Sequence, residues 1–274
     1  MTRPTPTRTR LPSILLGPCG RAARQAGPRV LTLRALSGLA LSACLAAAAA
    51  AGEGADVAPG EYIADGGWGR LSVAPAEGRG ADRASAFSLD SVGGNFHVCN
   101  LEGRIVDGRA TLESYGDEPA CVVHFAPTQD GLEVTGTAEC RQFCGMRAGF
   151  EGVYLRPPAG CGDAERTAAR AQFKRLYDGK RHAEALATLS PLTTRCARTL
   201  DRYEQGRILN DIAITQYRLG KREDCLRTLA PFAEEAALTD EAVLEGYPPS
   251  DGEAWLPIVK AARFNLGLCR KRAR

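Results

Sequence analysis

Histidine is scarce in this chain of 274 residues, and the familiar catalytic motifs are absent. The three histidines are His97, His124 and His182, and there is no G-x-S-x-G elbow, no H-E-x-x-H helix and no glycine-rich phosphate loop. Acidic pairs such as Asp117-Glu118 stand in loop-like sequence, which is typical of solvated charge. The sequence therefore predicts that the protein is not an enzyme and uses no cofactor. An envelope enzyme with an unfamiliar acid–base pair is the alternative.

Residues 1–51 contain no acidic side chain. They hold seven arginines, and after Arg34 comes a short apolar run that ends before the polar Gly52-Glu53 pair. A basic stretch, a short apolar run and small residues at its end are typical of a secretion signal peptide. The run is too short and too rich in alanine to predict a membrane span. We therefore expect residues 1–51 to direct export and to be processed.

Two processing routes fit this segment. Residues 49–51 are all alanine and suit ordinary cleavage before Gly52, whereas residues 41–44 (Leu-Ser-Ala-Cys) resemble the lipobox of bacterial lipoproteins. In the second route Cys44 is acylated and becomes the mature N-terminus. Translation starts near Val30 or Leu33 are alternatives to Met1. Both routes predict a cell-envelope protein, periplasmic in the first and anchored in the outer membrane in the second, where a lipid on Cys44 is the only membrane contact.

Removal of residues 1–51 also removes the excess of basic charge. Residues 52–162 carry 8 basic and 16 acidic side chains, and residues 163–274 carry 20 basic and 16 acidic ones. The first half is therefore acidic, the second mildly basic, and the mature chain is net negative. This balance gives no indication of a nucleic-acid partner.

Residues 58–156 consist of short runs of β-branched and aromatic residues separated by glycine, aspartate and proline. Such runs predict strands. Phe87 and Leu89 alternate with polar residues, which indicates one buried face. Asp107-Gly108 and Asp130-Gly131 are hairpin-turn signals. About eight short strands in this length predict a small antiparallel β-barrel or sandwich.

Residues 157–162 contain paired prolines and glycines and are expected to be a linker, after which residues 163–272 have a helical pattern. The stretch GKRHAEALATLSPL from Gly179 returns as GKREDCLRTLAPF from Gly220. The Leu, Thr and Pro matches are offset by 40 and the Gly-Lys-Arg starts by 41, which predicts that one residue is dropped in the turn. The stretch FNLGLCRK near the C-terminus echoes YRLGKRED at residues 217–224 and predicts that the last helix is the first half of a third repeat.

Helix pairs with a small residue and an aromatic at the turn resemble tetratricopeptide repeats. The resemblance covers about residues 163–270, although the period is nearer 40 than 34 and the usual Trp-Leu-Gly-Tyr pattern is only partly present. It implies a solenoid-like domain whose concave face binds a protein or peptide. A plain helical bundle is the alternative. The fold class is thus expected to be α+β, a small barrel or sandwich followed by an all-α repeat domain.

Eight cysteines remain in the mature chain after Cys19 and Cys44 are set aside. An even count in an exported protein predicts disulfides. We expect one pair across neighbouring strands, one around a tight loop and two between antiparallel helix ends: Cys99–Cys121, Cys140–Cys144, Cys161–Cys196 and Cys225–Cys269. Zinc held by the His and Cys residues of the first half is the alternative, and a metal site is not the favoured prediction.

Two groups of residues are candidates for binding. In residues 140–147 a short ring closed by Cys140–Cys144 would hold Arg141 and Phe143 outward, and Arg147 follows it. Arginine together with an aromatic residue is typical of interface hot spots. The alternative is that Phe143 packs into the barrel mouth and Arg141 is solvated.

The second group is polar and lies on the first helix of each repeat. It is expected to line the concave face without contributing to the core, or else simply to be solvated: Arg170, Lys174 and Asn210, together with Gln216 and Asn265.

The acidic, disulfide-bonded first half also loosely resembles bacterial periplasmic and lipoprotein lysozyme inhibitors. The resemblance is architectural and transfers no inhibitor residue, and the helical repeats are foreign to that family. It implies that the acidic half binds a cationic cell-wall hydrolase. The main expectation is an envelope adaptor that binds another protein or peptide; the inhibitor is the alternative.

The export hypothesis makes a direct prediction about the mature N-terminus. Mass spectrometry of the processed chain is expected to find it at Cys44 with a lipid or near Gly52 without one. Retention of residues 1–40 in the mature protein would contradict it.

Overall fold

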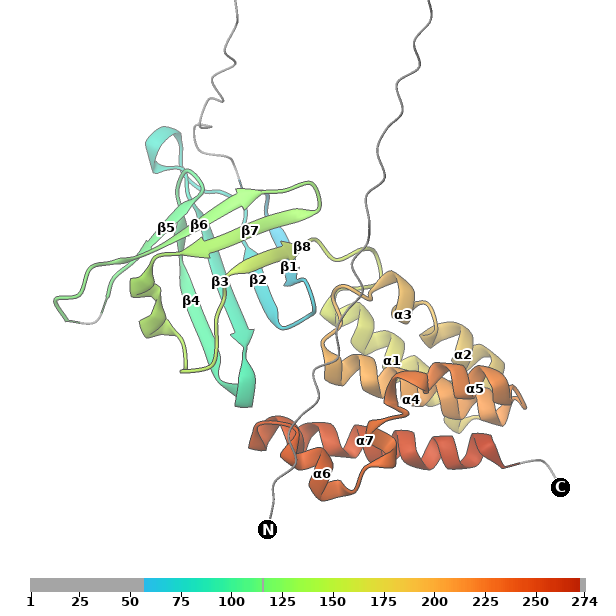
Figure 1. Cartoon of the computed structure of the whole chain (residues 1–274). Coiled ribbons are helices and arrows are strands. Elements are labelled where there is room, and N and C mark those ends of the chain that lie inside the picture. The colour runs from blue at the N-terminus through green and yellow to red at the C-terminus, as the bar shows by residue number, and fades with distance from the viewer. Residues whose placement is uncertain (1–56, 115, 272–274) are drawn as a thin grey trace, which may run out of the picture. The chain divides into compact units, whose positions relative to one another are not determined.

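The computed structural model describes residues 57–114 and 116–271, which form an α+β fold (Figure 1). An antiparallel barrel occupies residues 60–155, and helices follow it in the second half of the chain. The predicted fold class is confirmed at this level. The proposed signal segment and Cys44 lie outside the described residues.

The barrel is a meander in which consecutive strands pair, except β4 and β5, and the last strand pairs with the first. The sheet order is β4-β3-β2-β1-β8-β7-β6-β5, all antiparallel, so only the β4 and β5 edges remain to be closed. The strands are β1 (Gly60–Ala64), β2 (Gly69–Val73), β3 (Ser85–Val92), β4 (Val98–Ile105), β5 (Arg109–Leu112), β6 (Cys121–Pro127), β7 (Gly131–Gly136) and β8 (Gly152–Leu155).

A tight hairpin joins the two edge strands β4 and β5. Asp107 and Gly108 both have positive φ, 48° and 73°, as a two-residue type I′ turn requires. The Asp130-Gly131 signal likewise falls in the connection between β6 and β7, where the Thr128 N–H donates to the Gly131 carbonyl. Both predicted turns are therefore confirmed, and the first brings the edges of the sheet together.

Alternation along the strands builds the barrel core. In β3, Phe87 and Leu89 are buried and their neighbours Ala86 and Asp90 are exposed. The core also holds Tyr154, which is fully buried and donates its hydroxyl to the Phe150 carbonyl. Burial raises the pKa of Tyr154, so this hydroxyl remains a donor.

Two disulfides tie a 3₁₀ segment, η3 (Ala138–Phe143), to the barrel, but not in the expected pairs. The bonds are Cys99–Cys144 and Cys121–Cys140. The predicted Cys99–Cys121 and Cys140–Cys144 pairs are wrong because β5 lies between β4 and β6 in the chain and the two strands are not neighbours in the sheet. Cys140 within η3 instead bonds to Cys121 of β6, and Cys144, the residue after η3, bonds to Cys99 of β4.

The second half contains helices of unequal length. They are α1 (Asp163–Asp178), α2 (His182–Leu189), α3 (Leu192–Arg195), α4 (Arg202–Arg218), α5 (Arg222–Thr228), α6 (Asp240–Glu245) and α7 (Pro249–Arg270). Short 3₁₀ turns follow α5, namely η4 (Ala230–Phe232) and η5 (Glu235–Ala237).

The sequence repeat corresponds to two helix pairs, α1–α2 and α4–α5. The turn after each first helix has the same hydrogen bonds, Arg181 N–H to Leu176 O and Lys221 N–H to Gln216 O. Lys180 and Gly220 hold the left-handed position, with φ of 60° and 74°. The equivalence is therefore 40 residues throughout, and the prediction that one residue is dropped is wrong: the Gly-Lys-Arg match is shifted by one against the structure.

The helical cores use equivalent leucines of the two return helices. Leu189 and Leu229 are both fully buried. The Cys161–Cys196 and Cys225–Cys269 disulfides form as predicted, the second between α5 and α7. The α7 helix packs on α4 and α5. It continues through Gly267 without the turn that follows α1 and α4, so it resembles the first helix of a repeat only up to that residue.

The left-handed conformation at the turn predicts that replacing glycine with alanine lowers stability at Gly220 and raises it at Gly267, which lies within a helix. Gly220→Ala should cost about 1–2 kcal/mol because alanine is strained at positive φ, although no atom lies within 4 Å of the added Cβ. Gly267→Ala, in the exposed interior of α7 with the same open space, should stabilise by roughly 1 kcal/mol. Urea unfolding gives the change in the free energy of unfolding for each variant. Changes of the same sign in both variants would contradict the assigned turn.

Candidate functional site

The turn between β1 and β2 contacts the segment that leads into α4. The Gly66 N–H donates to the Arg198 carbonyl at 2.6 Å. At Gly67, with φ of 75°, an added Cβ would lie 2.2 Å from the Asp201 nitrogen, so only glycine allows the two backbones to approach this closely. Arg198 also pairs with Asp65 at 2.6 Å. The barrel and the helices therefore meet through backbone as well as side chains.

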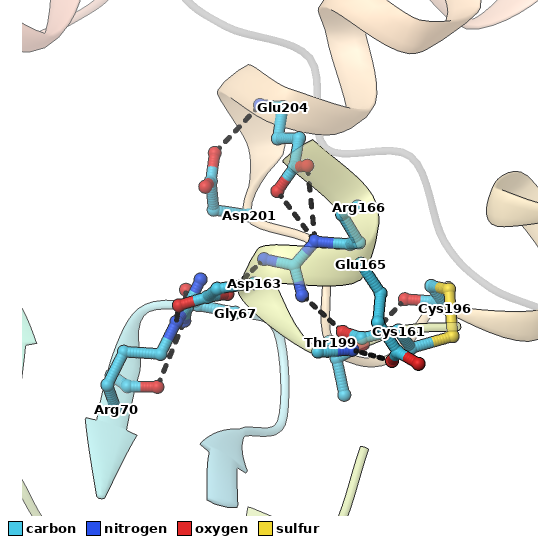
Figure 2. A network of polar contacts seen from close by, with 12 residues as sticks. Gly67, Arg70, Cys161, Asp163, Glu165, Arg166, Cys196, Thr199, Asp201 and Glu204 are labelled. Atoms are coloured by element: carbon cyan, nitrogen blue, oxygen red, sulfur yellow. Dashed lines mark hydrogen bonds and ion pairs between the residues drawn. A yellow bond between two sulfur atoms is a disulfide. The ribbon is translucent and has the colours of Figure 1, made fainter. Parts of the chain in front are cut away.

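A buried guanidinium lies beside this contact (Figure 2). Arg166 of α1 is 3% exposed, and it donates to Glu204 of α4 at 3.1 Å, to Asp163 at 2.6 Å and to the Cys161 carbonyl at 2.5 Å. Asp163 in turn accepts from Arg70 of β2 at 2.7 Å. The chain of contacts thus runs from the barrel through α1 to α4.

Asp163 is the shared carboxylate of this network. Partial burial works to raise its pKa, but the hydrogen bonds and positive charges of Arg70 and Arg166 outweigh burial, and the net pKa of Asp163 is lowered. A carboxyl group with a lowered pKa contributes stability above its unfolded pKa and loses that contribution as the pH falls through the folded value. The contact between the halves is therefore expected to weaken in acid.

A second contact joins the barrel to the start of α7. A 3₁₀ turn, η2 (Gly94–Phe96), places Asn95 so that its N–H donates to Asp251 at 2.8 Å and its side-chain oxygen accepts from the Ser250 N–H at 2.9 Å. Asp251 also accepts from the Tyr203 hydroxyl at 3.1 Å. Burial and this bond raise the pKa of Tyr203, which keeps the hydroxyl protonated.

A cleft of about 610 Å³ lies between these two contacts. Its walls come from the β1–β2 turn and η2 of the barrel and from the starts of α4 and α7. The aromatic and charged side chains that line it are Trp68, Phe96 and Tyr203, Arg70 and Arg202, and Asp90, Asp201 and Asp251.

The three carboxylates of the cleft have only neutral donors among the described residues. Asp90 accepts from the Asn100 amide, Asp201 caps α4 by accepting two backbone N–H groups, and Asp251 accepts as described above. Of the two arginines, Arg70 is neutralised by Asp163. Arg202 is held over aromatic rings, 4.2 Å from the centroid of Trp255. The unneutralised charges of the cleft are therefore mainly negative.

The rim of the cleft is conformationally strained. Asn95 and Phe96 both have positive φ, 58° and 56°, which is costly for a residue as bulky as phenylalanine. Phe96 remains 44% exposed and stacks on Tyr203 at 5.7 Å between ring centroids. Backbone strain of this kind is concentrated at functional sites, where the surrounding structure maintains it.

The predicted loop residues lie near this rim but do not project together. Arg141 folds back and donates to the Ala148 carbonyl at 2.6 Å and to the Met146 carbonyl. Phe143 is half-buried and packs against the barrel core, as the alternative interpretation expected. Arg147 is exposed, and its carbonyl accepts from Gly94 of η2.

The predicted groove residues are not brought together. Arg170 faces Asp211 at 3.8 Å and Lys174 forms an exposed pair with Asp178. Asn210 is buried and donates to the Ile258 carbonyl, and the buried Asn265 amide donates to Asn210. The expectation that Asn210 and Asn265 line a groove outside the core is wrong, because they join α4 to α7 inside it.

The eight cysteines of the described chain are all in disulfides, so their sulfurs are not available as zinc ligands. Within residues 57–114 and 116–271 no cluster of three metal-binding side chains occurs. In the same residues no helix has the length and apolarity to span a membrane.

Comparison with known proteins found no family model, no curated protein and no solved structure that matches this chain. The candidate site is therefore supported by its geometry alone. The cleft could not be predicted from the sequence because its residues come from four separated segments of the chain. The signals that could have indicated it are the paired glycines at 66–67 and 93–94, which mark close backbone approaches.

The lowered pKa of Asp163 gives a prediction for stability against pH. Asp163→Asn should cost about 1 kcal/mol at pH 7, after allowance for solvent screening, and should flatten the loss of stability between pH 7 and pH 3. Asp178→Asn, which removes an exposed pair with Lys174, should cost under about 0.5 kcal/mol. Urea unfolding at both pH values measures this. If the two variants lose the same free energy of unfolding and show the same pH dependence, the Asp163 network does not stabilise the contact between the barrel and the helices.

Proposed function

We propose that this protein is a non-enzymatic binding protein of the bacterial cell envelope that holds a cationic protein or peptide in the cleft between its barrel and its helices. The observation that carries the proposal is the set of three cleft carboxylates with neutral partners only. A carboxylate without a cation attracts a basic side chain with little competition from internal ion pairs.

The charge of the barrel half supports the same partner. Residues 52–162 carry 16 acidic and 8 basic side chains. An acidic surface speeds the encounter with a basic partner and makes the association sensitive to salt. Exported proteins meet basic partners in the cell wall, and the four disulfides are consistent with an oxidising compartment.

The aromatic side chains provide the apolar part of the site. Phe96 and Tyr203 come from opposite walls and stack at the rim, and Trp68 lies at the barrel wall with an edge contact to Tyr154. Rigid aromatic rings beside charged groups are the usual composition of binding hot spots. An extended basic segment with an aromatic or aliphatic residue would fill such a cleft.

Two finer proposals accompany this one. The helical half acts as a tetratricopeptide-like scaffold that presents the α4 and α7 wall of the cleft, which makes the protein an adaptor. The acidic barrel favours the alternative of lysozyme-inhibitor-like binding to a cationic cell-wall hydrolase. Export by the signal segment, with or without a lipid on Cys44, is part of both.

Egg-white lysozyme is a suitable basic probe for the proposed function. Calorimetry at low salt is expected to detect binding that weakens as NaCl is added. Phe96→Ala should weaken it at least about tenfold because it removes the aromatic rim. Phe264→Ala is the matched control, since Phe264 is 66% exposed on α7 and outside the cleft, and it should bind as the wild type does.

The lysozyme assay also distinguishes the adaptor from the lysozyme-inhibitor-like protein. Inhibition of lysozyme activity on cell walls favours the inhibitor, and binding without inhibition favours the adaptor. Absence of binding both to lysozyme and to a lysine- and tryptophan-rich test peptide, or equal effects of the two phenylalanine substitutions, would contradict the proposal.

A further inference from the structure

A second cavity, of about 340 Å³, lies on another side of the contact between the barrel and the helices. Three arginines line it: Arg156 after β8, Arg195 at the end of α3 and Arg198 in the α3–α4 connection. Asp130 is the only acidic residue among the lining residues. It shares no lining residue with the cleft described above. The two sites are therefore separate.

Two of these guanidinium groups have no carboxylate partner among the described residues. Arg156 donates to the Pro59 carbonyl at 3.0 Å and to the Tyr62 hydroxyl at 2.8 Å, and it lies over the Tyr62 ring. All of these partners are neutral. Arg195 is exposed, and one of its terminal nitrogens would lie 3.3 Å from a Cβ added to Gly160. Two positive charges thus remain uncompensated around one cavity.

The third arginine, Arg198, has one close and one looser carboxylate partner. Arg198 pairs closely with Asp65, at 2.6 Å, and more loosely with Asp130, at 3.4 Å. An incoming anion can therefore replace Asp130 at the second guanidinium nitrogen without breaking the pair with Asp65. Asp130 is 63% exposed and free to turn toward water.

Covalent and backbone links hold the three segments in place before any ligand arrives. The Cys161–Cys196 disulfide joins the segment after Arg156 to the residue next to Arg195. The Arg156 N–H donates to the Asp130 carbonyl at 3.0 Å. Preorganised guanidinium groups recognise tetrahedral oxyanions well because each can donate two parallel hydrogen bonds.

We propose that this cavity binds a phosphate group, carried either by a soluble phosphate ester or ion or by a lipid headgroup. The cavity of about 340 Å³ leaves room for further atoms attached to the phosphate. Phosphate binding would add an anionic contact to a protein whose cleft favours cations. The inference does not depend on the function proposed for the cleft.

The first test measures inorganic phosphate binding to the full mature chain by calorimetry, with chloride at equal ionic strength as the reference. Arg195→Gln should weaken binding at least about tenfold, the loss expected for one charge-assisted hydrogen bond. Arg175→Gln is the matched control, an exposed arginine in the last turn of α1 and outside the cavity, and it should bind as the wild type does.

Asp130→Asn provides a second variant with the opposite sign. Removal of the one competing carboxylate should tighten phosphate binding, an effect that damage to the fold would not produce. The proposal is overturned if phosphate binds no better than chloride, if Arg195→Gln and Arg175→Gln bind alike, or if Asp130→Asn fails to tighten binding.

A vesicle arm distinguishes the two sources of phosphate. Wild-type protein is mixed with phosphatidylcholine vesicles with and without phosphatidic acid, and sedimentation is compared with that of Arg195→Gln. Arg195-dependent binding to the phosphatidic acid vesicles supports a lipid headgroup as the source. Binding of inorganic phosphate alone supports a soluble ligand.

Discussion

The burial of one guanidinium group is the constraint on which the arrangement of the two halves depends. Arg166 is 3% exposed, and a charge taken out of water costs several kcal/mol unless it is paired and hydrogen-bonded. Glu204, Asp163 and the Cys161 carbonyl together compensate it. Glu204 lies in α4, whereas Asp163 and the Cys161 carbonyl lie at the start of α1 and just before it, so the guanidinium stabilises one relative position of α1, α4 and the connection to the barrel. Through Asp163 and Arg70 the constraint reaches β2 (Figure 2).

The two candidate sites follow from that arrangement. The cleft forms where the β1–β2 turn and η2 meet α4 and α7, and the smaller cavity forms where the segment after β8 meets the α3–α4 connection. Neither half alone supplies both walls of either site. The cleft has three aspartates whose hydrogen-bond donors are neutral, and the cavity has two arginines without a carboxylate partner among the described residues, so charges of opposite sign lie at two separate places along one interface.

Local patterns in the sequence predicted several of the elements. Alternation at Phe87 and Leu89 identified a strand with one buried face, Asp107-Gly108 identified the hairpin, and the leucine repeat identified equivalent helix pairs. Disulfide partners in the helices could be inferred because antiparallel helix ends must meet. The barrel partners could not, because sequence does not reveal that η3 directs Cys140 and Cys144 to different strands.

The candidate sites could not be predicted from the sequence for a related reason. Asn210 is polar and was expected to be accessible, yet its amide satisfies backbone groups between two packed helices. A polar residue in a helix therefore does not indicate its exposure. Asp90, Asp201 and Asp251 are far apart in the chain, and only the packing of the barrel on the helices makes them neighbours of one cleft. Long-range contact of this kind leaves no periodic signal in the sequence.

If the buried Arg166 network joins the barrel to the helices, the two should unfold as one cooperative unit, and the two tryptophans allow this to be measured. Trp68 lies in the barrel and Trp255 in α7. In Trp255→Phe, fluorescence reports the barrel while far-ultraviolet circular dichroism reports mainly the helices; Trp68→Phe places the fluorescent reporter in the helices. In urea with the disulfides intact, the account predicts that fluorescence and dichroism follow one transition with a common midpoint in each variant. Separate midpoints for the barrel and the helices in Trp255→Phe would contradict it.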